Sequence, residues 1–173
     1  MGIRNYLIEG VSGTGKTSVC RELQRRGFHA INGDRALAYQ GDPKTGEPVG
    51  GFAHEHHIWD VGKVRALAAD QSQAASFFCG GSRNFAQFID LFDLVFVLEI
   101  DRDTLDRRLA ERPDDEWGSR PAERQLIRRL HATGEDRPEG GIAVDATLPV
   151  ERVVDAILER CGQAIDARHI RLQ

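Results

Sequence analysis

The residues Glu9–Ser18, with the sequence EGVSGTGKTS, have the types and the spacing that bind phosphate. They match the P-loop pattern G-x-x-x-x-G-K-[ST], with Lys16 and Thr17 at its last two positions. The glycines let backbone N–H groups turn toward phosphate oxygens, the lysine adds a positive charge, and the hydroxyl is a hard oxygen ligand for Mg²⁺. The predicted nucleotide-phosphate site consists of Gly10, Val11, Ser12, Gly13, Thr14, Gly15, Lys16, Thr17 and Ser18.

The segments on either side have the character that this site needs. Arg4–Glu9 is a short run with β-forming residues that is closed by glycine, which predicts a strand. Lys16–Arg26 has apolar residues at helical spacing and Gly27 after its last turn, which predicts a helix. A helix that begins near Lys16 would add its free N–H donors and the positive end of its dipole to the phosphate site.

Strands and helices are expected to alternate along the rest of the chain. Further strands are predicted at Phe28–Ile31, Ala75–Cys79, Leu94–Ile100 and Ile142–Val144. Further helices are predicted at Gly33–Tyr39, Asp60–Ala69, Arg83–Leu91, Thr104–Arg112, Pro121–His131 and Pro149–Cys161. This alternation predicts an α/β fold, in which helices cover both faces of a parallel sheet.

Length and composition limit the classes of protein that fit. The chain has 173 residues, of which 40% are hydrophobic, and this suits one compact domain with a sizeable core. Its net charge of −4 disfavours non-specific binding to nucleic acid. The scattered Cys20, Cys79 and Cys161 indicate reduced thiols in a cytoplasmic protein. We expect neither an export signal nor a membrane span, because no apolar run approaches the ~20 residues that a span needs.

Several classes of P-loop protein lack support in this sequence. Switch GTPases carry a guanine-reading Asn-Lys-x-Asp motif, which is missing here. Motor and AAA-type ATPases have a larger domain and a hydrophobic strand that ends in Asp-Glu. The strand ends in this chain are Cys79-Gly80-Gly81 and Glu99-Ile100-Asp101, so we do not expect an ATPase of that type.

The order of the features resembles that of the P-loop small-molecule kinases, which include adenylate kinase and other nucleoside monophosphate kinases, shikimate kinase and gluconate kinase. The resemblance covers roughly Arg4–Glu159. It implies a three-layer P-loop NTPase fold with a five-stranded parallel sheet of order 2-3-1-4-5. It also implies one domain over residues 1–173, with an acceptor-binding insertion at about 40–70 and an Arg-rich lid at about 112–121.

Asp34 follows the second predicted strand, where hydroxyl-phosphorylating relatives carry an aspartate that holds or deprotonates the acceptor hydroxyl. Such a carboxylate must lie within hydrogen-bond reach of the attacking oxygen. The alternative role for Asp34 is an N-cap of the helix that follows.

The stretch Phe78–Arg83 resembles both the Gly-rich turn of shikimate kinase and the Asp-Gly-x-Pro-Arg turn of adenylate kinase. Arg83 matches the arginine that grips the acceptor phosphate in the latter, and its alternative role is a solvated helix start. Cys79 stands where the aspartate of that turn is expected, and Ser82 stands where the proline is. With that aspartate lost, Asp34 is a candidate ligand of the metal together with Thr17.

Arginines flank the expected lid and would neutralise the transferring phosphoryl group when the lid closes. We rank the candidates in the order Arg112, Arg120 and Arg108. The alternative is that most of these arginines form surface ion pairs at helical spacing, with Asp103, Asp106, Glu111 and Glu123 as partners.

Two further stretches have candidate roles. His54-Glu55-His56-His57 is interpreted as part of the acceptor pocket, with Phe52 and Trp59 as stacking surfaces. A plain surface loop is the alternative, and a metal site ranks third because no second ligand pair stands elsewhere. Asp145 and Thr147 resemble the segment that packs near the adenine base, with a simple capped turn as the alternative.

The sequence therefore predicts an enzyme that uses ATP and Mg²⁺ to phosphorylate a small molecule, with a nucleoside or a nucleotide as the favoured acceptor. A non-nucleoside hydroxyl compound, such as a shikimate-like, gluconate-like or drug-like molecule, is the first alternative. A nucleotide-dependent binding or resistance protein with little turnover is the second. The acidic balance argues against a polynucleotide kinase. The acceptor, the preference for ATP over GTP, and the oligomeric state stay open.

Overall fold

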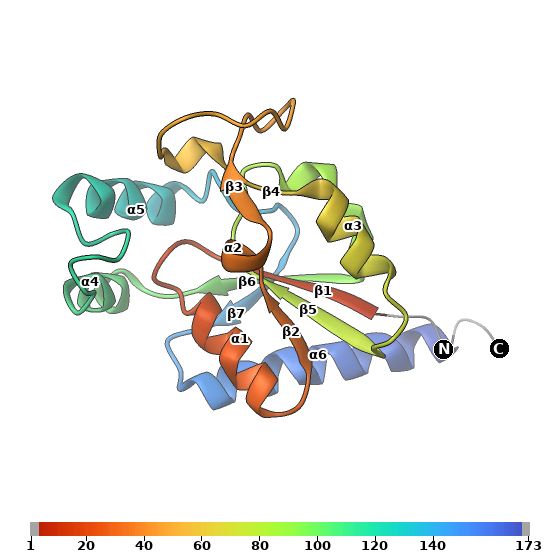
Figure 1. The fold of residues 1–173 in the computed structure, drawn as a ribbon. Coiled ribbons are helices and arrows are strands. Elements are labelled where there is room, and N and C mark those ends of the chain that lie inside the picture. The colour runs from red at the N-terminus through yellow and green to blue at the C-terminus, as the bar shows by residue number, and fades with distance from the viewer. Residues whose placement is uncertain (1–3, 171–173) are drawn as a thin grey trace.

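A computed structural model describes residues 4–170 of the chain, with side chains up to residue 162. Its centre is a parallel sheet of five strands in the order β2-β5-β1-β6-β7 (Figure 1). The strands are β1 (Arg4–Glu9), β2 (His29–Asn32), β5 (Ala75–Cys79), β6 (Leu94–Glu99) and β7 (Ile142–Asp145). Counted along the chain, these five lie in the order 2-3-1-4-5, so the predicted α/β fold is confirmed.

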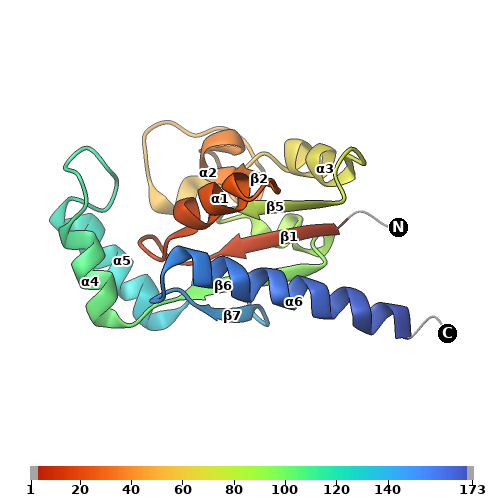
Figure 2. The ribbon, with the colours of Figure 1, turned by 90° about the horizontal axis from the view of Figure 1, so that it is seen from below.

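Helices cover both faces of this sheet. Residues 4–170 contain the α-helices α1 (Lys16–Arg25), α2 (Gly33–Ala36), α3 (Val61–Ala69), α4 (Arg102–Ala110), α5 (Pro121–Thr133) and α6 (Val150–Ile170). In Figure 1, α1 and α6 lie below the sheet and α3 lies above it. Figures 1 and 2 both place α4 and α5 side by side beyond the carboxyl end of β1, next to the loop that leads into α1.

Alternation of side chains along β1 produces two hydrophobic clusters. Tyr6 and Ile8 pack in the larger cluster with residues of α1 and α6, whereas Leu7 packs in the second cluster with residues of α3. Successive strand side chains point to opposite faces, so a strand buried on both faces reads as a continuous apolar run. Every residue of β1 from Asn5 to Glu9 is buried, and this fixes the strand that carries the P-loop.

Capping side chains and a proline explain where several helices begin. The Asp60 side chain accepts a hydrogen bond from the Lys63 N–H at the start of α3. Asp101 does the same for the Thr104 N–H at the start of α4. Pro121 stands at the first turn of α5, where its missing N–H costs nothing.

The structure corrects the predicted helix through Tyr39. Helix α2 ends at Ala36, and β3 (Ala38–Gln40) then pairs antiparallel with β4 (His57–Trp59) in a second, two-stranded sheet. Residues far along the chain supply the pairing partner, and such partners override a local helical pattern. The intervening residues 41–56 include four glycines and a 3₁₀ turn at His54–His56.

Two other predicted helices have different lengths or types. The segment predicted as a helix from Arg83 to Leu91 forms two short 3₁₀ turns, Phe85–Gln87 and Ile89–Leu91, around the buried Phe88. The last helix extends to Ile170, beyond the predicted end at Cys161. Within the described part of the chain, no helix combines the length and the apolar character that crossing a membrane requires.

Candidate functional site

The P-loop connects the carboxyl end of β1 to the start of α1. Gly10 has a φ of 153°, and a Cβ there would lie 2.5 Å from Thr14 Oγ1 and 3.0 Å from the Leu98 carbonyl oxygen. Only glycine fits this close approach, so the backbone can make the tight turn that the P-loop requires. The Lys16 ammonium donates hydrogen bonds to the carbonyl oxygens of Gly10 and Val11, and therefore points into the centre of the P-loop.

A cavity of about 600 Å³ opens in front of the P-loop, and we call it the nucleotide cavity. Its volume suits a small-molecule ligand such as a nucleotide. Its lining residues are Ser12, Gly13, Thr14, Gly15, Lys16, Thr17, Ser18, Val19, Asp34, Arg108, Arg112, Glu116, Trp117, Ala146, Leu148, Val150 and Val153. It therefore brings together the predicted phosphate-binding residues from Ser12 to Ser18 with two of the three ranked arginines.

Those two arginines reach the P-loop from α4 and from the segment after it. Arg108 donates hydrogen bonds to the carbonyl oxygens of Gly13 and Thr14, both at 3.2 Å, and to that of Ala146 at 2.8 Å. Arg112 donates one to Ser12 Oγ at 3.0 Å. Burial lowers the pKa of both guanidinium groups. Both cations thus lie where phosphate oxygens would gather.

Arg120 is placed differently from the other two. It is exposed at the N-cap position of α5 and does not line the nucleotide cavity. Its backbone N–H donates to the Glu123 carboxylate, which anchors the start of the helix. Of the three ranked arginines, Arg108 and Arg112 therefore line the cavity in front of the P-loop.

Asp34 lies at the wall between the nucleotide cavity and a second, smaller pocket. Its Oδ1 accepts a hydrogen bond from the Gly81 N–H at 3.1 Å and lies 3.2 Å from His57 Nε2. Burial alone would raise the pKa of Asp34, but the contact with His57 and the positive charge of Lys16 lower it below its usual value. Asn32, and not Asp34, accepts the capping hydrogen bond of α2. The N-cap alternative for Asp34 is therefore wrong, and the carboxylate is available to a ligand.

Trp59 packs against the backbone that holds Asp34 and is not the ligand-stacking surface that the sequence suggested. It is fully buried and stacks on Phe88, with ring centroids 5.7 Å apart and an interplanar angle of 3°. Its indole fills the space where a Cβ on Gly33 or Gly80 would stand. Trp59 therefore packs under the residues on both sides of the Asp34 carboxylate.

The smaller pocket, of about 190 Å³, is called the acceptor pocket here. It is lined by Gly10, Val11, Ser12, Lys16, Asp34, Phe52, His54, His57, Gly81, Arg83, Trp117 and Asp136. Phe52, His54 and His57 line it, whereas Glu55 and His56 of the predicted cluster do not. His54 also stacks on Trp117, with ring centroids 5.5 Å apart. No set of three or more His, Cys, Asp or Glu residues within the described structure is arranged to hold a metal ion.

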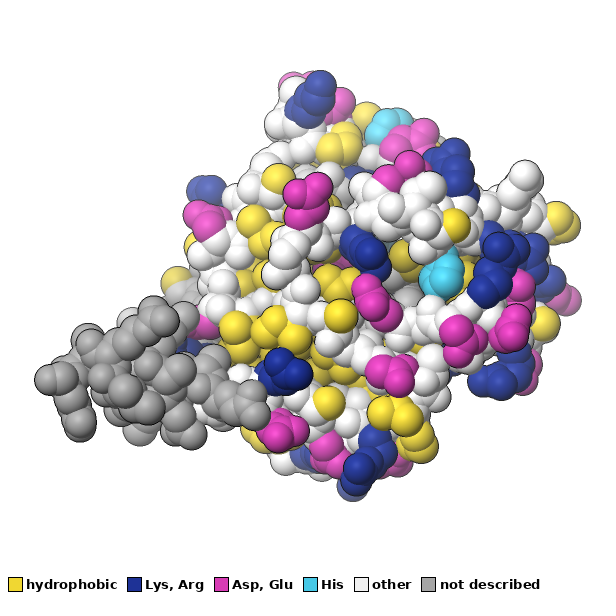
Figure 3. Space-filling model, turned by 180° about the vertical axis from the view of Figure 1, so that it is seen from behind, with side chains coloured by type: hydrophobic (Ala, Val, Ile, Leu, Met, Phe, Trp, Pro, Cys, Tyr) yellow, Lys and Arg dark blue, Asp and Glu magenta, His cyan; other side chains and the backbone are white. Residues whose placement is uncertain are grey.

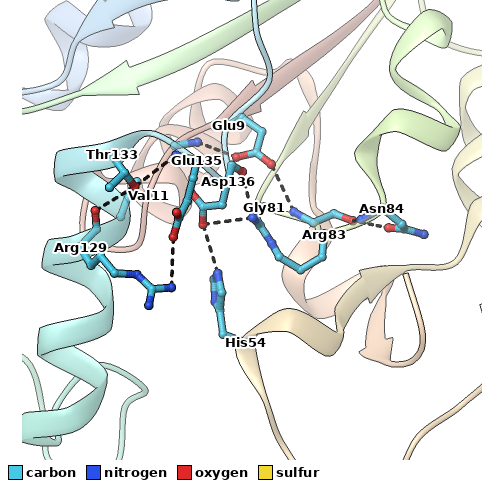
Figure 4. A network of polar contacts seen from close by, with 12 residues as sticks. Glu9, Val11, His54, Gly81, Arg83, Asn84, Arg129, Thr133, Glu135 and Asp136 are labelled. Atoms are coloured by element: carbon cyan, nitrogen blue, oxygen red, sulfur yellow. Dashed lines mark hydrogen bonds and ion pairs between the residues drawn. The ribbon is translucent and has the colours of Figure 1, made fainter. Parts of the chain in front are cut away.

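Arg83 lies in the acceptor pocket but is already paired. Its Nη1 lies 3.1 Å from Asp136 Oδ2 and donates to the Asp136 carbonyl oxygen at 2.9 Å. Asp136 Oδ2 also lies 3.1 Å from His54 Nε2, and Figure 4 shows both contacts converging on this carboxylate. Asp136 lies between α5 and β7 in a stretch without a motif, so sequence reasoning missed it.

Glu9 is the second functional candidate that sequence reasoning missed. It is fully buried at the end of β1, where its two carboxylate oxygens accept hydrogen bonds from the Gly10 N–H at 2.9 Å and the Ser82 N–H at 3.2 Å. Burial raises the pKa of Glu9 to about 7, against the opposing charges of Lys16 and Arg83. A glutamate that closes an apolar strand directly before a P-loop was the available signal. Glu9 ties the P-loop to the turn that carries Arg83 (Figure 4).

Cys79, which stands where an aspartate was expected, and the predicted base-site residues Asp145 and Thr147 line neither the nucleotide cavity nor the acceptor pocket. Cys79 is buried, and burial raises the pKa of its thiol well above the usual value. Asp145 accepts hydrogen bonds from the N–H and hydroxyl groups of Thr147 at 2.9 Å and 2.6 Å, and neither residue lines the nucleotide cavity. Their neighbours Ala146 and Leu148 do line it, so the segment reaches the cavity through its apolar residues.

Thr17 and Asp34 are the protein oxygens that fit a Mg²⁺ ion. Both side chains line the nucleotide cavity near Lys16, and both offer the hard oxygen donors that this ion prefers. Mg²⁺ usually takes only one or two ligands from the protein and completes its shell with water and phosphate oxygens. Two donors are therefore a sufficient set for this ion.

Comparisons with known proteins agree with this geometry. A family model described as an AAA domain matches residues 7–147. No match is found among the curated proteins. Three solved structures have the same fold at low sequence identity. An unliganded sugar kinase from Janibacter sp. HTCC2649 has 20% identity and a TM-score of 0.59, covering 91% of this chain and 94% of that one.

The other two structures are similar over nearly the whole length. A gluconokinase from Sinorhizobium meliloti 1021 has 17% identity and a TM-score of 0.60, covering 98% of both chains. A shikimate kinase from Acinetobacter baumannii, in complex with shikimate, has 16% identity and a TM-score of 0.60, covering 95% of this chain and 94% of that one. At such identities the similarity establishes the fold.

Proposed function

The chain belongs to the AAA domain family, and on that premise we propose that it is an ATP-dependent kinase of a small molecule. Its acceptor is a hydroxyl compound, with a nucleoside or nucleotide favoured over a sugar acid. The fold of P-loop small-molecule kinases supports this proposal. The three cysteines, all free and buried, suit the reducing cytoplasm, which we propose as its location.

The family model is described as an AAA domain, although the sequence predicts no motor or AAA-type ATPase. The similarity to P-loop small-molecule kinases supports that prediction. That expectation rested on strand ends without an Asp-Glu pair, and β5 and β6 indeed end in Cys79 and Glu99. The family match extends from Leu7, within β1, over the P-loop and the later strands of the central sheet through β7.

One observation carries the proposal: the Asp34 carboxylate lines both cavities. Ser12, Lys16 and Trp117 also line both. A lowered pKa keeps Asp34 ionised at neutral pH, so it can accept a proton. A carboxylate between a phosphate cradle and a second pocket is the arrangement that transfer from one ligand to the other requires.

The proposed reaction is an in-line displacement at the γ-phosphorus. The acceptor oxygen attacks the phosphorus, the bond to the oxygen of the ADP leaving group breaks, and Asp34 takes the proton of the hydroxyl. Lys16, Arg108 and Arg112 balance the charge on the phosphoryl oxygens. When bound by Thr17 and Asp34, Mg²⁺ would supply further neutralisation of phosphate charge.

Kinases of non-nucleoside hydroxyl compounds are the second candidate. Gly80-Gly81 after β5 and the Asp34 carboxylate favour this reading. The similar structures include proteins described as a gluconokinase and a shikimate kinase, but identities of 16–17% transfer no substrate to this chain. Gluconate and shikimate therefore belong in any panel of acceptors.

The experiment that tests the proposal compares wild type with Asp34→Asn. Nucleosides, nucleoside monophosphates, gluconate and shikimate are each incubated with ATP and Mg²⁺, and phosphorylated products are measured by mass spectrometry. We expect Asp34→Asn to lower kcat by a factor on the order of 10²–10⁴ while the affinity for ATP is kept. The exposed Asp90 supplies the matched control Asp90→Asn, which should retain wild-type kcat.

Two outcomes would count against a kinase. One is the absence of any phosphorylated product from wild type despite tight ATP binding. The other is an Asp34→Asn variant that transfers phosphate as fast as wild type. If a ligand binds with ATP but is never modified, nucleotide-dependent sequestration becomes the better account.

A further inference from the structure

We propose that the acceptor is an uncharged hydroxyl compound with a flat ring, and that Asp136 determines this preference by neutralising Arg83. The inference rests on the proposed kinase function. Of the two favoured acceptor classes, it selects the uncharged nucleosides and excludes the charged nucleotides. It also reverses the role expected for Arg83, which was that of gripping an acceptor phosphate.

The first support is the geometry of the Arg83–Asp136 pair. The two side chains are only 13% and 11% exposed, and Arg83 Nη1 contacts both the carboxylate and the carbonyl oxygen of Asp136. A largely buried ion pair keeps much of its attraction because little water screens it. An incoming phosphate or carboxylate would have to compete with this partner for the guanidinium group.

His54 holds the same carboxylate in place. Its Nε2 lies 3.1 Å from Asp136 Oδ2, the atom that also pairs with Arg83 (Figure 4). Burial would raise the pKa of Asp136, but the contact with His54 and the charge of Arg83 lower it instead. The carboxylate therefore stays ionised and keeps its negative charge in the pocket.

The remaining charges of the acceptor pocket also oppose an anion. Asp34 adds a second negative charge, while Lys16 points into the P-loop, where the phosphates of ATP would bind. With Arg83 paired, the two carboxylates outweigh the one cation on the acceptor side. The binding of an anionic acceptor beside these like charges would be weakened by its desolvation and by electrostatic repulsion.

Aromatic side chains indicate the flat ring. Large apolar side chains are exposed at three described positions, which are Phe28, Phe52 and Leu148. Leu148 lines the nucleotide cavity, and Phe52, which is 66% exposed, lines the acceptor pocket. The stacked rings of His54 and Trp117 line the same pocket. Aromatic faces of this kind pack well against a planar ligand.

The test uses pairs of compounds that differ only in charge. Each of four nucleosides and its own 5′-monophosphate is assayed with ATP and Mg²⁺, and kcat/KM is measured for both. In wild type we expect kcat/KM for at least one nucleoside to exceed that for its monophosphate by more than about 10-fold. One charged hydrogen bond changes binding by about 10- to 100-fold.

The decisive variants are Asp136→Asn and the double variant Arg83→Gln/Asp136→Asn. Asp136→Asn keeps the shape and the backbone contact with Arg83 but removes the negative charge that neutralises the guanidinium group. The preference should therefore shift toward the monophosphate by about 10- to 100-fold. The double variant also removes the cation and should lose that gain. Binding of a non-hydrolysable ATP analogue, measured for each variant, shows whether the P-loop site is intact.

The outcomes separate the inference from the function on which it rests. A wild type that prefers the monophosphates, gluconate or shikimate would overturn the inference and leave the kinase function standing. So would an Asp136→Asn variant that binds the analogue normally but keeps the wild-type preference. If no compound of any class is phosphorylated, the proposed function itself fails.

Discussion

Glu9 is the residue whose chemistry depends most on its surroundings. It closes β1, lies under the P-loop and is fully buried. Its carboxylate binds the N–H groups of Gly10 and Ser82, so it joins the nucleotide side of the site to the acceptor side. Since water cannot solvate the charged form there, the neutral acid is favoured up to a pH of about 7.

This burial makes the stability of the protein depend on pH. The pKa of Glu9 is about 7 in the folded chain, compared with an ordinary value of 4.5. Its contribution to the free energy of unfolding is therefore fully present below pH 4.5 and is lost as the pH rises to 7. The difference in pKa corresponds to about 3 kcal/mol.

We predict that Glu9→Gln removes this part of the pH dependence. Glutamine cannot ionise, so wild type should lose more stability than the variant between pH 5 and pH 8. Urea unfolding at several pH values measures both free energies, and the gap between them should change by up to about 3 kcal/mol. The exposed Glu111 supplies the control Glu111→Gln.

The Glu111→Gln variant should follow the wild-type curve at every pH. The idea fails if the free energies of wild type and Glu9→Gln stay a constant distance apart across this range. Such parallel curves would mean that Glu9 has the same pKa in the folded and unfolded chains.

At the scale of elements, β4 positions the proposed base through Trp59. The indole lies against Gly33 at the start of α2 and Gly80 after β5, the two elements whose ends meet at Asp34. Asn84 binds both the N–H and the carbonyl group of Trp59 at 3.0 Å and 2.9 Å. The β3–β4 hairpin therefore supports the proposed base and also forms part of the wall of the acceptor pocket.

We predict that Gly80→Ala damages catalysis through this packing. A Cβ at Gly80 would lie 2.6 Å from Trp59 Cζ2 and 2.7 Å from Asp34 Oδ1, and the φ of 155° disfavours any other residue. Strained backbone of this kind costs about 1–3 kcal/mol of stability. Displacing the carboxylate by about 1 Å should lower kcat by about 100-fold.

The matched control is Gly50→Ala, because a Cβ there meets no atom within 4 Å and the residue has no positive φ. Steady-state kinetics and thermal unfolding of both variants separate the two effects. Wild-type kcat in Gly80→Ala would show that the contact with Asp34 has no catalytic weight.

The contrast between local and distant contacts explains what could be predicted. The P-loop, the strand before it and the caps of α3 and α4 depend on neighbouring residues, and all of them appear in the sequence. The pairing of β3 with β4 depends on residues about twenty positions apart. Propensity alone therefore extended α2 through Tyr39.

The candidate site divides in the same way. Asp34 could be located because a strand end in this topology is a defined place beside the P-loop. The partner of Arg83 could not be, because Asp136 lies 53 positions away in a loop without a pattern. Buried Trp59 was mistaken for a surface ring, since a sequence does not show which face an aromatic residue presents.

At the scale of the whole molecule, charge gives little basis for binding a polyanion. The net charge is −4, and on the face seen in Figure 3 basic and acidic side chains lie next to one another. The basic side chains placed to bind a ligand lie together at the nucleotide cavity, which Lys16, Arg108 and Arg112 line. Electrostatic attraction is thus directed to one small site.

The shared wall of the two cavities predicts that their ligands bind cooperatively. Ser12, Lys16, Asp34 and Trp117 line both, and Trp117 also stacks on His54 across the acceptor pocket. A ligand that orders these side chains removes part of the entropy cost for the second ligand. We therefore expect a non-hydrolysable ATP analogue and an accepted nucleoside together to stabilise the protein by more than the sum of their separate effects.

Thermal unfolding with each ligand alone and with both measures this coupling. The analogue at 100 times its dissociation constant should add about 2.7 kcal/mol, which is readily detected. Lys16→Ala should lose the shift caused by the analogue and, with it, the extra shift caused by the nucleoside. Purely additive shifts would mean that the two cavities bind their ligands independently. Trp117 and Asp34 would then separate the two ligands without coupling their binding.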